Sequence, residues 1–165
     1  MKKQHFIQVI DSNQGIIRSL CRVYYPHIED QQDAYQDIVL QLWKSFDSYQ
    51  GKSKRSTWIY SVSLNTLLTK ARKDKKAVAT EPIVPSHLHM TQPMADDHVE
   101  LLSMILQSLN DLDKAIVVLY LEGYGNKEMA KMLKITPSHV STRLNRVKSQ
   151  LKSKYGSSTH AAKRP

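Results

Sequence analysis

The chain has 165 residues, which suits one ordinary domain or two small ones, and 41% of them are apolar, enough for packed cores. Its 24 lysines and arginines outnumber 15 acidic residues, and a net charge of +9 favours polyanionic partners such as nucleic acid or an anionic membrane. The single cysteine, Cys21, excludes an internal disulfide. With neither an apolar leader nor an 18-residue apolar run, the sequence indicates a soluble, cytoplasmic protein.

Helical periodicity dominates the sequence and predicts an all-α fold. Apolar residues recur at intervals of three and four, whereas alternating strand-like runs are scarce. Charge divides the chain into a first block at 1–76 with net charge +6, a middle block at 77–97 with −3, and a last block at 98–165 with +6. The two basic blocks are therefore separate candidates for contact with a polyanion.

The middle block contains Pro82, Pro85 and Pro93 and has no lysine or arginine. Prolines at this density prevent a helix and favour an extended chain. The sequence therefore predicts two small helical domains joined by an extended, proline-containing linker. The expected boundaries are 1–76 for the first domain, 77–97 for the linker, 98–155 for the second domain and 156–165 for a disordered tail.

The first block contains three helical patterns. The apolar stripe of the first stops at Pro26, and the second repeats every four residues from Ala34 to Phe46. The third follows a glycine, with Ser53 or Ser56 as its candidate N-cap. This predicts a three-helix domain.

The last block begins with a helix that includes Leu101, Leu102, Ile105 and Leu109. Asn110 or Asp111 are candidate N-caps of the next helix, because asparagine and aspartate accept hydrogen bonds from the free N–H groups at a helix start. That helix is expected to end at one of two glycines, Gly123 or Gly125.

Residues 127–148 carry apolar residues at helical spacing on both sides of Pro137. Proline inside a helix costs about 3 kcal/mol, but at the first helical position its missing N–H costs nothing. With Thr136 as N-cap, Pro137 therefore begins a second helix, and the segment is a helix-turn-helix. Lys134 stands where the turn commonly has glycine, so a left-handed backbone is expected there.

The second of these helices mixes short hydrogen-bonding side chains with arginines on the face opposite Val140, Leu144 and Val147. Such a mixture suits the major groove of DNA, and residues 126–155 hold eight basic side chains against one acidic. The alternative is a plain two-helix packing unit. The predicted DNA contacts are Ser138, His139, Ser141, Thr142, Arg143, Asn145 and Arg146, with at least one arginine reading bases and neither needed for the core.

Three segments resemble bacterial extracytoplasmic-function (ECF) sigma factors. DQQDAYQDIVLQLW (30–43) is similar to the family's core-polymerase-binding helix, and GKSKRSTWIYSVSLNTLLTKARKDKK (51–76) to the segment that follows it. Residues 109–152 resemble the family's C-terminal DNA-binding domain. Three positions depart from the family pattern, Arg55, Ser56 and Ser141, and they affect promoter preference rather than class.

The resemblance implies that the protein binds core RNA polymerase, directs it to a promoter and opens the duplex. An acidic-edged helix with an apolar body would dock on a basic coiled coil of the polymerase. The alternative is that these acidic residues only stabilise the N-terminus of the helix by interacting with the helix dipole. The implied polymerase-binding residues are Asp30, Asp33, Gln36, Asp37 and Leu42.

Promoter melting is implied for residues 52–76, which hold eight basic side chains and one acidic. Basic groups hold the strand, while aromatic groups or a pocket near the 46–54 loop accept an unstacked base. The alternative for Trp58 is core packing, which we favour, and Asn65 is balanced between the two. The residues assigned to melting are Lys52, Lys54, Arg55, Trp58, Asn65 and Arg72.

The resemblance also implies a role for the linker and a further binding partner. The linker either threads through the polymerase, mimicking nucleic acid, or is a passive tether. An anti-sigma factor is a potential further partner, and no cofactor, metal or small-molecule substrate is expected.

Two rival classes remain. An enzyme would need a site such as a metal centre, and the candidate ligands are His87, His89, Asp96, Asp97 and His98, which lack regular spacing on a rigid element. A stand-alone helix-turn-helix regulator would use the last block alone. It would not need the two segments in the first block that resemble a sigma factor.

Overall fold

The computed structural model describes residues 1–78 and 97–156. Within these ranges the structure has seven α-helices and one short 3-10 helix, with no strand, so the predicted all-α class is confirmed. The chain forms two compact units, Met1–Ser103 (the N-terminal unit) and Met104–Pro165 (the C-terminal unit). The predicted conformations of the linker between 79 and 96 and of the tail from 157 onward lie outside the described residues.

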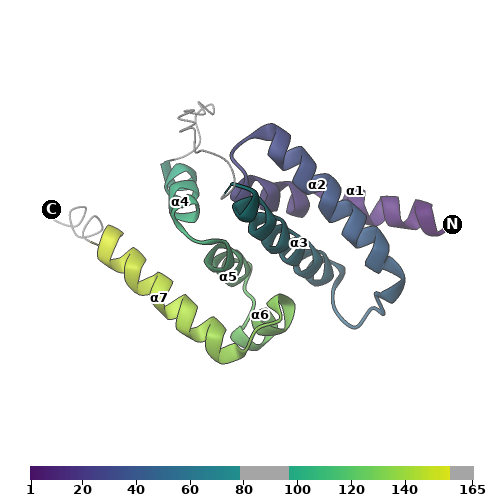
Figure 1. The fold of residues 1–165 in the computed structure, drawn as a ribbon. Helices are drawn as coiled ribbons and strands as arrows, with labels where there is room; N and C mark the ends of the chain where they lie inside the picture. The colour runs from purple at the N-terminus through teal and green to yellow at the C-terminus, as the bar shows by residue number, and fades with distance from the viewer. Residues whose placement is uncertain (79–96, 157–165) are drawn as a thin grey trace. The chain divides into compact units, whose positions relative to one another are not determined.

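Three long helices form the N-terminal unit (Figure 1): α1 (Lys2–Tyr24), α2 (Ile28–Ser45) and α3 (Arg55–Val78). Each of these helices packs against the other two. Each contributes fully buried aliphatic residues, among them Ile17, Ile38 and Leu64. Because every helix is 18 residues or longer, each presents an apolar stripe of several turns to this common core.

The junctions of these helices follow the sequence signals except at one cap. Helix α1 ends at Tyr24, two residues before Pro26, as predicted. A short 3-10 helix, η1 (Phe46–Ser48), continues α2, and α3 begins at Arg55. Lys54 therefore precedes α3, and the predicted cap at Ser53 or Ser56 is wrong. Ser53 belongs to the preceding loop, where its carbonyl accepts a hydrogen bond from the Tyr49 hydroxyl.

Four further helices follow: α4 (Asp97–Ser108), α5 (Asp111–Leu121), α6 (Asn126–Leu133) and α7 (Pro137–Tyr155). The boundary between the two compact units falls inside α4. Helix α7 packs against both α5 and α6 (Figure 1). The core of the C-terminal unit consists mainly of Ile116, Leu119, Met129, Val140 and Val147.

The caps of α5 confirm one of the two predicted alternatives. The side chain of Asn110 accepts a hydrogen bond from the Asp113 backbone N–H at 2.9 Å, so Asn110 is the N-cap. The helix ends at Leu121, earlier than either predicted glycine, and Gly123 adopts a left-handed backbone with φ 89° in the turn that follows. No helix in the described part of the chain is both long and apolar enough to cross a membrane.

Candidate nucleic-acid interface

Helices α6 and α7 form the helix-turn-helix that the sequence predicts. Lys134 takes the left-handed conformation expected of it, with φ 57° and ψ 42°. The Thr136 side chain accepts a hydrogen bond from the His139 backbone N–H at 3.1 Å, and Pro137 is the first residue of α7. The turn therefore ends one helix and begins the next within three residues, as the proline required.

The predicted DNA-contacting residues lie on α7, but they are not equally exposed. Five of the seven are exposed, whereas Ser141 and Arg143 are half-buried. The Ser141 hydroxyl accepts a hydrogen bond from the Asn126 side-chain amide at 2.7 Å, which ties the start of α6 to α7. Sequence reasoning missed this contact because the two residues are 15 positions apart. The exposed residues are Ser138, His139, Thr142, Asn145 and Arg146.

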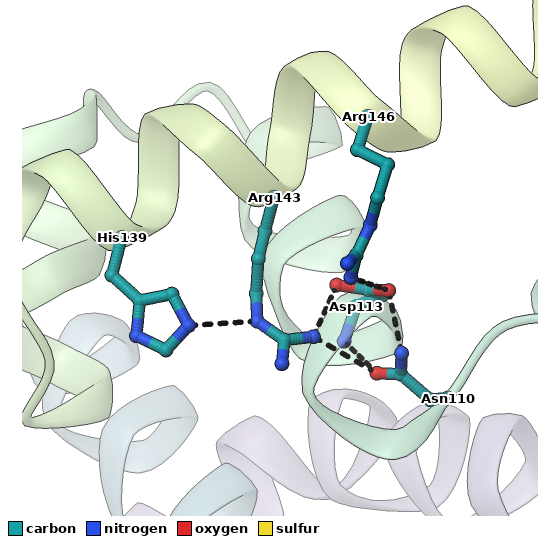
Figure 2. A network of polar contacts seen from close by, with 5 residues as sticks. All are labelled: Asn110, Asp113, His139, Arg143 and Arg146. Atoms are coloured by element: carbon teal, nitrogen blue, oxygen red, sulfur yellow. Dashed lines mark hydrogen bonds and ion pairs between the residues drawn. The ribbon is translucent and has the colours of Figure 1, made fainter.

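Asp113, on the first turn of α5, gathers the polar groups beside this face (Figure 2). Its carboxylate accepts hydrogen bonds from Nη1 of Arg143 at 2.9 Å and from Nη2 of Arg146 at 3.3 Å. The Asn110 amide donates to the same carboxylate at 2.7 Å. On the other side, the Arg143 Nε–H donates to Nε2 of His139 at 2.9 Å. Two predicted DNA-binding arginines thus share one buried carboxylate.

This network corrects one sequence-based expectation, that both arginines project away from the core. Arg143 precedes Leu144 and follows Val140 by three positions, so it lies at the edge of the buried stripe of α7, where α5 packs. Its side chain is 24% exposed, against 51% for Arg146. Periodicity alone places both on the polar side and cannot show that a carboxylate 30 residues earlier reaches the nearer one.

The residues assigned to promoter melting do not form one cluster. Lys52, Lys54 and Arg55 are exposed in and next to the loop before α3, whereas Arg72 is exposed far along the same helix. Arg72 follows Arg55 by 17 positions of helix, or about 25 Å at 1.5 Å per residue. Asn65 lies half-buried between them and donates to the Ser61 carbonyl at 2.7 Å. The structure therefore brings the first group together and leaves Arg72 apart.

An aromatic hollow of about 200 Å³ lies where the loop after α2 meets the start of α3. The Tyr49 and Trp58 rings are 5.0 Å apart between centroids, and Phe46 lies 6.1 Å from Trp58. Trp58 is half-buried, so it contributes both to packing and to the wall of the hollow. Sequence reasoning named Trp58 and Arg55 but missed the α1 residues, which only tertiary packing brings here. The lining residues are His5, Val9, Phe46, Tyr49, Arg55 and Trp58.

The acidic residues of α2 remain on the surface. Asp30, Asp33 and Gln36 are exposed, and Asp37 forms an ion pair with Lys70 of α3 at 3.3 Å. Leu42 is fully buried, so its predicted role as a contact residue is corrected, because a side chain without exposed surface cannot touch a partner.

An apolar hollow of about 470 Å³ lies beside this acidic surface, between α1 and α2. Ile7, Leu40 and Trp43 leave 45%, 48% and 36% of their surface exposed there. These exposed neighbours, rather than Leu42, provide the apolar surface. The residues lining the hollow are Lys3, Phe6, Ile7, Tyr35, Gln36, Val39, Leu40 and Trp43.

For the metal-site alternative, the described residues contain no group of three or more His, Cys, Asp or Glu side chains that could hold a metal ion. His87, His89 and Asp96 lie outside those residues, while Asp97 and His98 begin α4. Cys21 is buried in α1, and this burial raises the pKa of its thiol from 9.0 to about 11. The thiol is therefore protonated at neutral pH and suited to packing.

Comparisons with known proteins agree with this division into two units. The family model for sigma-70 region 2 matches residues 9–77, and the model for sigma-70 region 4 matches residues 100–151. The ECF RNA polymerase sigma factor SigW of Bacillus subtilis is 25% identical over 162 residues, covering 89% of this chain and 87% of its own. SigM of Mycobacterium tuberculosis is 26% identical over 152 residues, covering 88% of this chain and 74% of its own.

Solved structures show the same fold. The sigma factor RpoE of Bartonella quintana, solved with the anti-sigma factor NepR, has a TM-score of 0.67 at 18% identity, covering 92% of this chain and 94% of its own. CnrH, solved with the cytosolic domain of CnrY, has a TM-score of 0.63 at 17% identity, and the match covers 94% of this chain and 90% of the CnrH chain.

The two family models match in the order region 2 then region 4 and together account for most of the chain. The chain therefore belongs to the sigma-70 family, within its ECF group, and is a sigma factor that directs RNA polymerase to promoters. A stand-alone regulator is not favoured, because it would have no use for a region 2 domain.

Proposed function

We propose that this ECF sigma factor divides its work between its two units, with polymerase binding and promoter melting in the first and recognition of the upstream promoter element in the second. The proposed domains are 1–76 and 98–155 with a linker at 77–97, and the helices overrun that linker by two residues at Val78 and by one at Asp97. The observation that carries the proposal is the helix-turn-helix, whose exposed α7 face combines arginine with short hydrogen-bonding groups, in a chain that also matches region 2. The protein acts as a non-enzymatic regulator in the cytoplasm, where polymerase and promoters are found.

Core polymerase is proposed to bind α2 through an acidic edge next to an apolar surface. Asp30, Asp33 and Gln36 supply exposed polar groups, and Asp37 adds a carboxylate already paired with Lys70. The apolar hollow between α1 and α2 supplies desolvated contact area of the kind found at the centre of protein interfaces. Leu42 contributes indirectly, because it holds α2 against the core of the unit.

The aromatic hollow is proposed to accept a base extracted from the melted strand. Tyr49 and Trp58 provide faces for stacking, and Arg55 provides a cation for the backbone or base edge. Extracting one base costs a few kcal/mol, which stacking and hydrogen bonds in the hollow must offset. Lys52 and Lys54 lie exposed beside it and would neutralise phosphates, whereas Arg72 would contact DNA at a separate point.

An anti-sigma factor is proposed as a further partner of this chain. The two structural neighbours described above were solved with such a partner or with the cytosolic domain of a second protein, and this chain shares their fold. The exposed apolar surface of α1 and α2 would be covered in such a complex. No cofactor is part of the proposal.

The test is transcription by a holoenzyme assembled from the full chain and core RNA polymerase on a library of duplexes randomised upstream of a reporter. We expect the chain to co-purify with the core, and we expect transcripts to come from a small set of related sequences. Transcription no higher than with core polymerase alone, from a chain that still binds DNA, would overturn the proposal and favour a stand-alone regulator.

A further inference from the structure

Asp113 is a buried carboxylate beside the surface proposed to bind DNA, and the proposed function assigns it no role. Its residue is 3% exposed, and it occupies the third position of α5, where the helix dipole favours a negative charge. The carboxylate accepts three side-chain hydrogen bonds, from Asn110, Arg143 and Arg146. A buried charge with this many partners fixes the positions of the groups that donate to it.

The hydrogen bonds of Arg143 leave it poorly able to read a base. An arginine recognises guanine by donating two parallel N–H groups from neighbouring nitrogens to O6 and N7. In Arg143 the Nε–H donates to His139, and Nη1 donates to both Asp113 at 2.9 Å and Asn110 at 3.4 Å. Each edge of the guanidinium has therefore lost one of its two groups. Arg143 cannot form a bidentate contact without giving up an internal one.

Arg146 is in the opposite situation. Within the described residues only its Nη2 donates, to Asp113 at 3.3 Å, and its side chain is 51% exposed. Four of the five N–H groups of a guanidinium then remain, including one complete edge. Asp113 therefore restrains where Arg146 can point while leaving it a bidentate donor pair.

We propose that Asp113 is a specificity-determining positioning residue: it retains Arg143 as an internal support and orients Arg146 as the arginine that reads a base pair. The inference rests on the proposed function, because it requires α7 to enter the major groove. It also assigns separate roles to two arginines that the sequence could not distinguish.

The test uses the full-chain holoenzyme, a duplex that it selects from a randomised library, and single-base variants of that duplex. If no sequence is enriched, the proposed function fails and this inference fails with it. If one is enriched, affinity is measured for the selected duplex, for its variants and for a scrambled duplex at several salt concentrations. The variants are Asp113→Asn and Arg146→Ala. A third variant, Glu122→Gln at the exposed C-cap of α5, is the control for the loss of one negative charge.

We expect Arg146→Ala to remove preference at one base pair, reducing discrimination there by about tenfold. Asp113→Asn should weaken preference at that same base pair by roughly three- to tenfold, and it should raise affinity for scrambled DNA because two guanidiniums lose their anion. In the Arg146→Ala background, Asp113→Asn should have no further effect at that position. The Glu122→Gln control should keep the full preference.

A purely structural role for Asp113 would lower affinity for all duplexes alike and would overturn the inference, as would a gain in affinity restricted to the selected duplex. Circular dichroism shows whether Asp113→Asn folds. If it does not, Arg143→Lys carries the test, because a single ammonium cannot contact both Asp113 and His139. We expect that variant to weaken preference only at the base pair that Arg146 reads. Lost preference at a different base pair would show that Arg143 reads DNA itself and would overturn the inference.

Discussion

The two units of this sigma factor are stabilised in different ways. In the described residues of the N-terminal unit, Ser63 is the one polar or charged residue that is buried. Neither α1 nor α2 has a side-chain hydrogen bond at its N-cap. The C-terminal unit buries Asp113 and Lys114 and has a side-chain hydrogen bond at the start of α5, α6 and α7. Long helices with a common apolar core need few such devices, whereas helices of 8 and 11 residues are marginal without them.

This contrast teaches where function is free to vary. The N-terminal unit keeps its charges on the surface, where they are available to partners at little cost to the fold. The C-terminal unit ties α7, the helix proposed to bind DNA, to a buried charge, so residues proposed for recognition also stabilise the unit. The following predictions test that difference, from the largest expected effect to the smallest.

The largest effect is expected from Ile38→Ala in the core of the N-terminal unit. Ile38 is fully buried, and removing most of its side chain should cost about 2–5 kcal/mol, because the cavity collapses only in part. Hydrogen exchange measured by mass spectrometry should show faster exchange in α1, α2 and α3 and unchanged protection in α5, α6 and α7. Leu40→Ala, on the exposed side of the same helix, is the control and should change little. Loss of protection throughout both units would show that they share one folding transition.

The next effect concerns polymerase rather than folding. Reversing both Asp33 and Asp37 to lysine should weaken co-purification with core polymerase by on the order of 100-fold, about 3 kcal/mol, because like charges would face each other. Helical circular dichroism should remain, since Asp33 is exposed and Asp37 loses only a surface pair with Lys70. For a matched comparison of single reversals, Asp33→Lys should impair binding and the exposed α1 variant Asp11→Lys should not. Normal binding by the double variant would show that α2 is not part of the interface with core polymerase.

Thr136→Ala should cost about 1 kcal/mol of C-terminal-unit stability, because the free N–H of His139 loses its acceptor at the start of α7. His27→Ala is the counterpart in the N-terminal unit, at a cap that makes no side-chain hydrogen bond, and should stay within about 0.5 kcal/mol of wild type. Chemical denaturation followed by exchange in each unit measures both. Equal costs at the two caps would erase the distinction between the units.

The smallest effect, and one of opposite sign, is expected at the turn. Lys134→Gly should stabilise the C-terminal unit by about 0.5–1 kcal/mol, because glycine adopts a φ of 57° without the Cβ clash that lysine tolerates. Lys131→Gly, inside α6, should destabilise it by about 1 kcal/mol. A lower melting temperature for Lys134→Gly would mean that its side chain contributes more than its backbone costs.

Local signals in the sequence were sufficient for the helix-turn-helix. Thr136, Pro137 and Lys134 each act within a few residues of their own position, so cap, helix start and left-handed turn all followed from chemistry that the sequence displays. The fold class and the family followed in the same way, from periodicity and from motifs in a fixed order.

Features that depend on tertiary contacts did not follow. Leu42 has the same apolar character as Leu40, and only packing shows that one is fully buried and the other exposed. His5 of α1 joins the aromatic hollow although it lies 41 positions before Phe46, and the centroids of these two rings are 5.6 Å apart. Asp113 looked like an ordinary first-turn acid, and nothing near it in the sequence indicates two arginines on α7.

The hydrogen bond between Asn126 and Ser141 has a practical consequence for anyone re-engineering promoter choice in this protein. Exchanging α7 for that of a relative is the obvious graft, and it can replace Ser141 with a residue that accepts no hydrogen bond, such as lysine. A lysine there gives Asn126 a second donor instead of an acceptor, and the same graft can leave Asp113 facing foreign side chains. The transplantable module is therefore larger than the helix proposed to contact DNA. It includes α7 together with Asn110, Asp113 and Asn126, and a donor sequence should be chosen for agreement at those three supporting positions first.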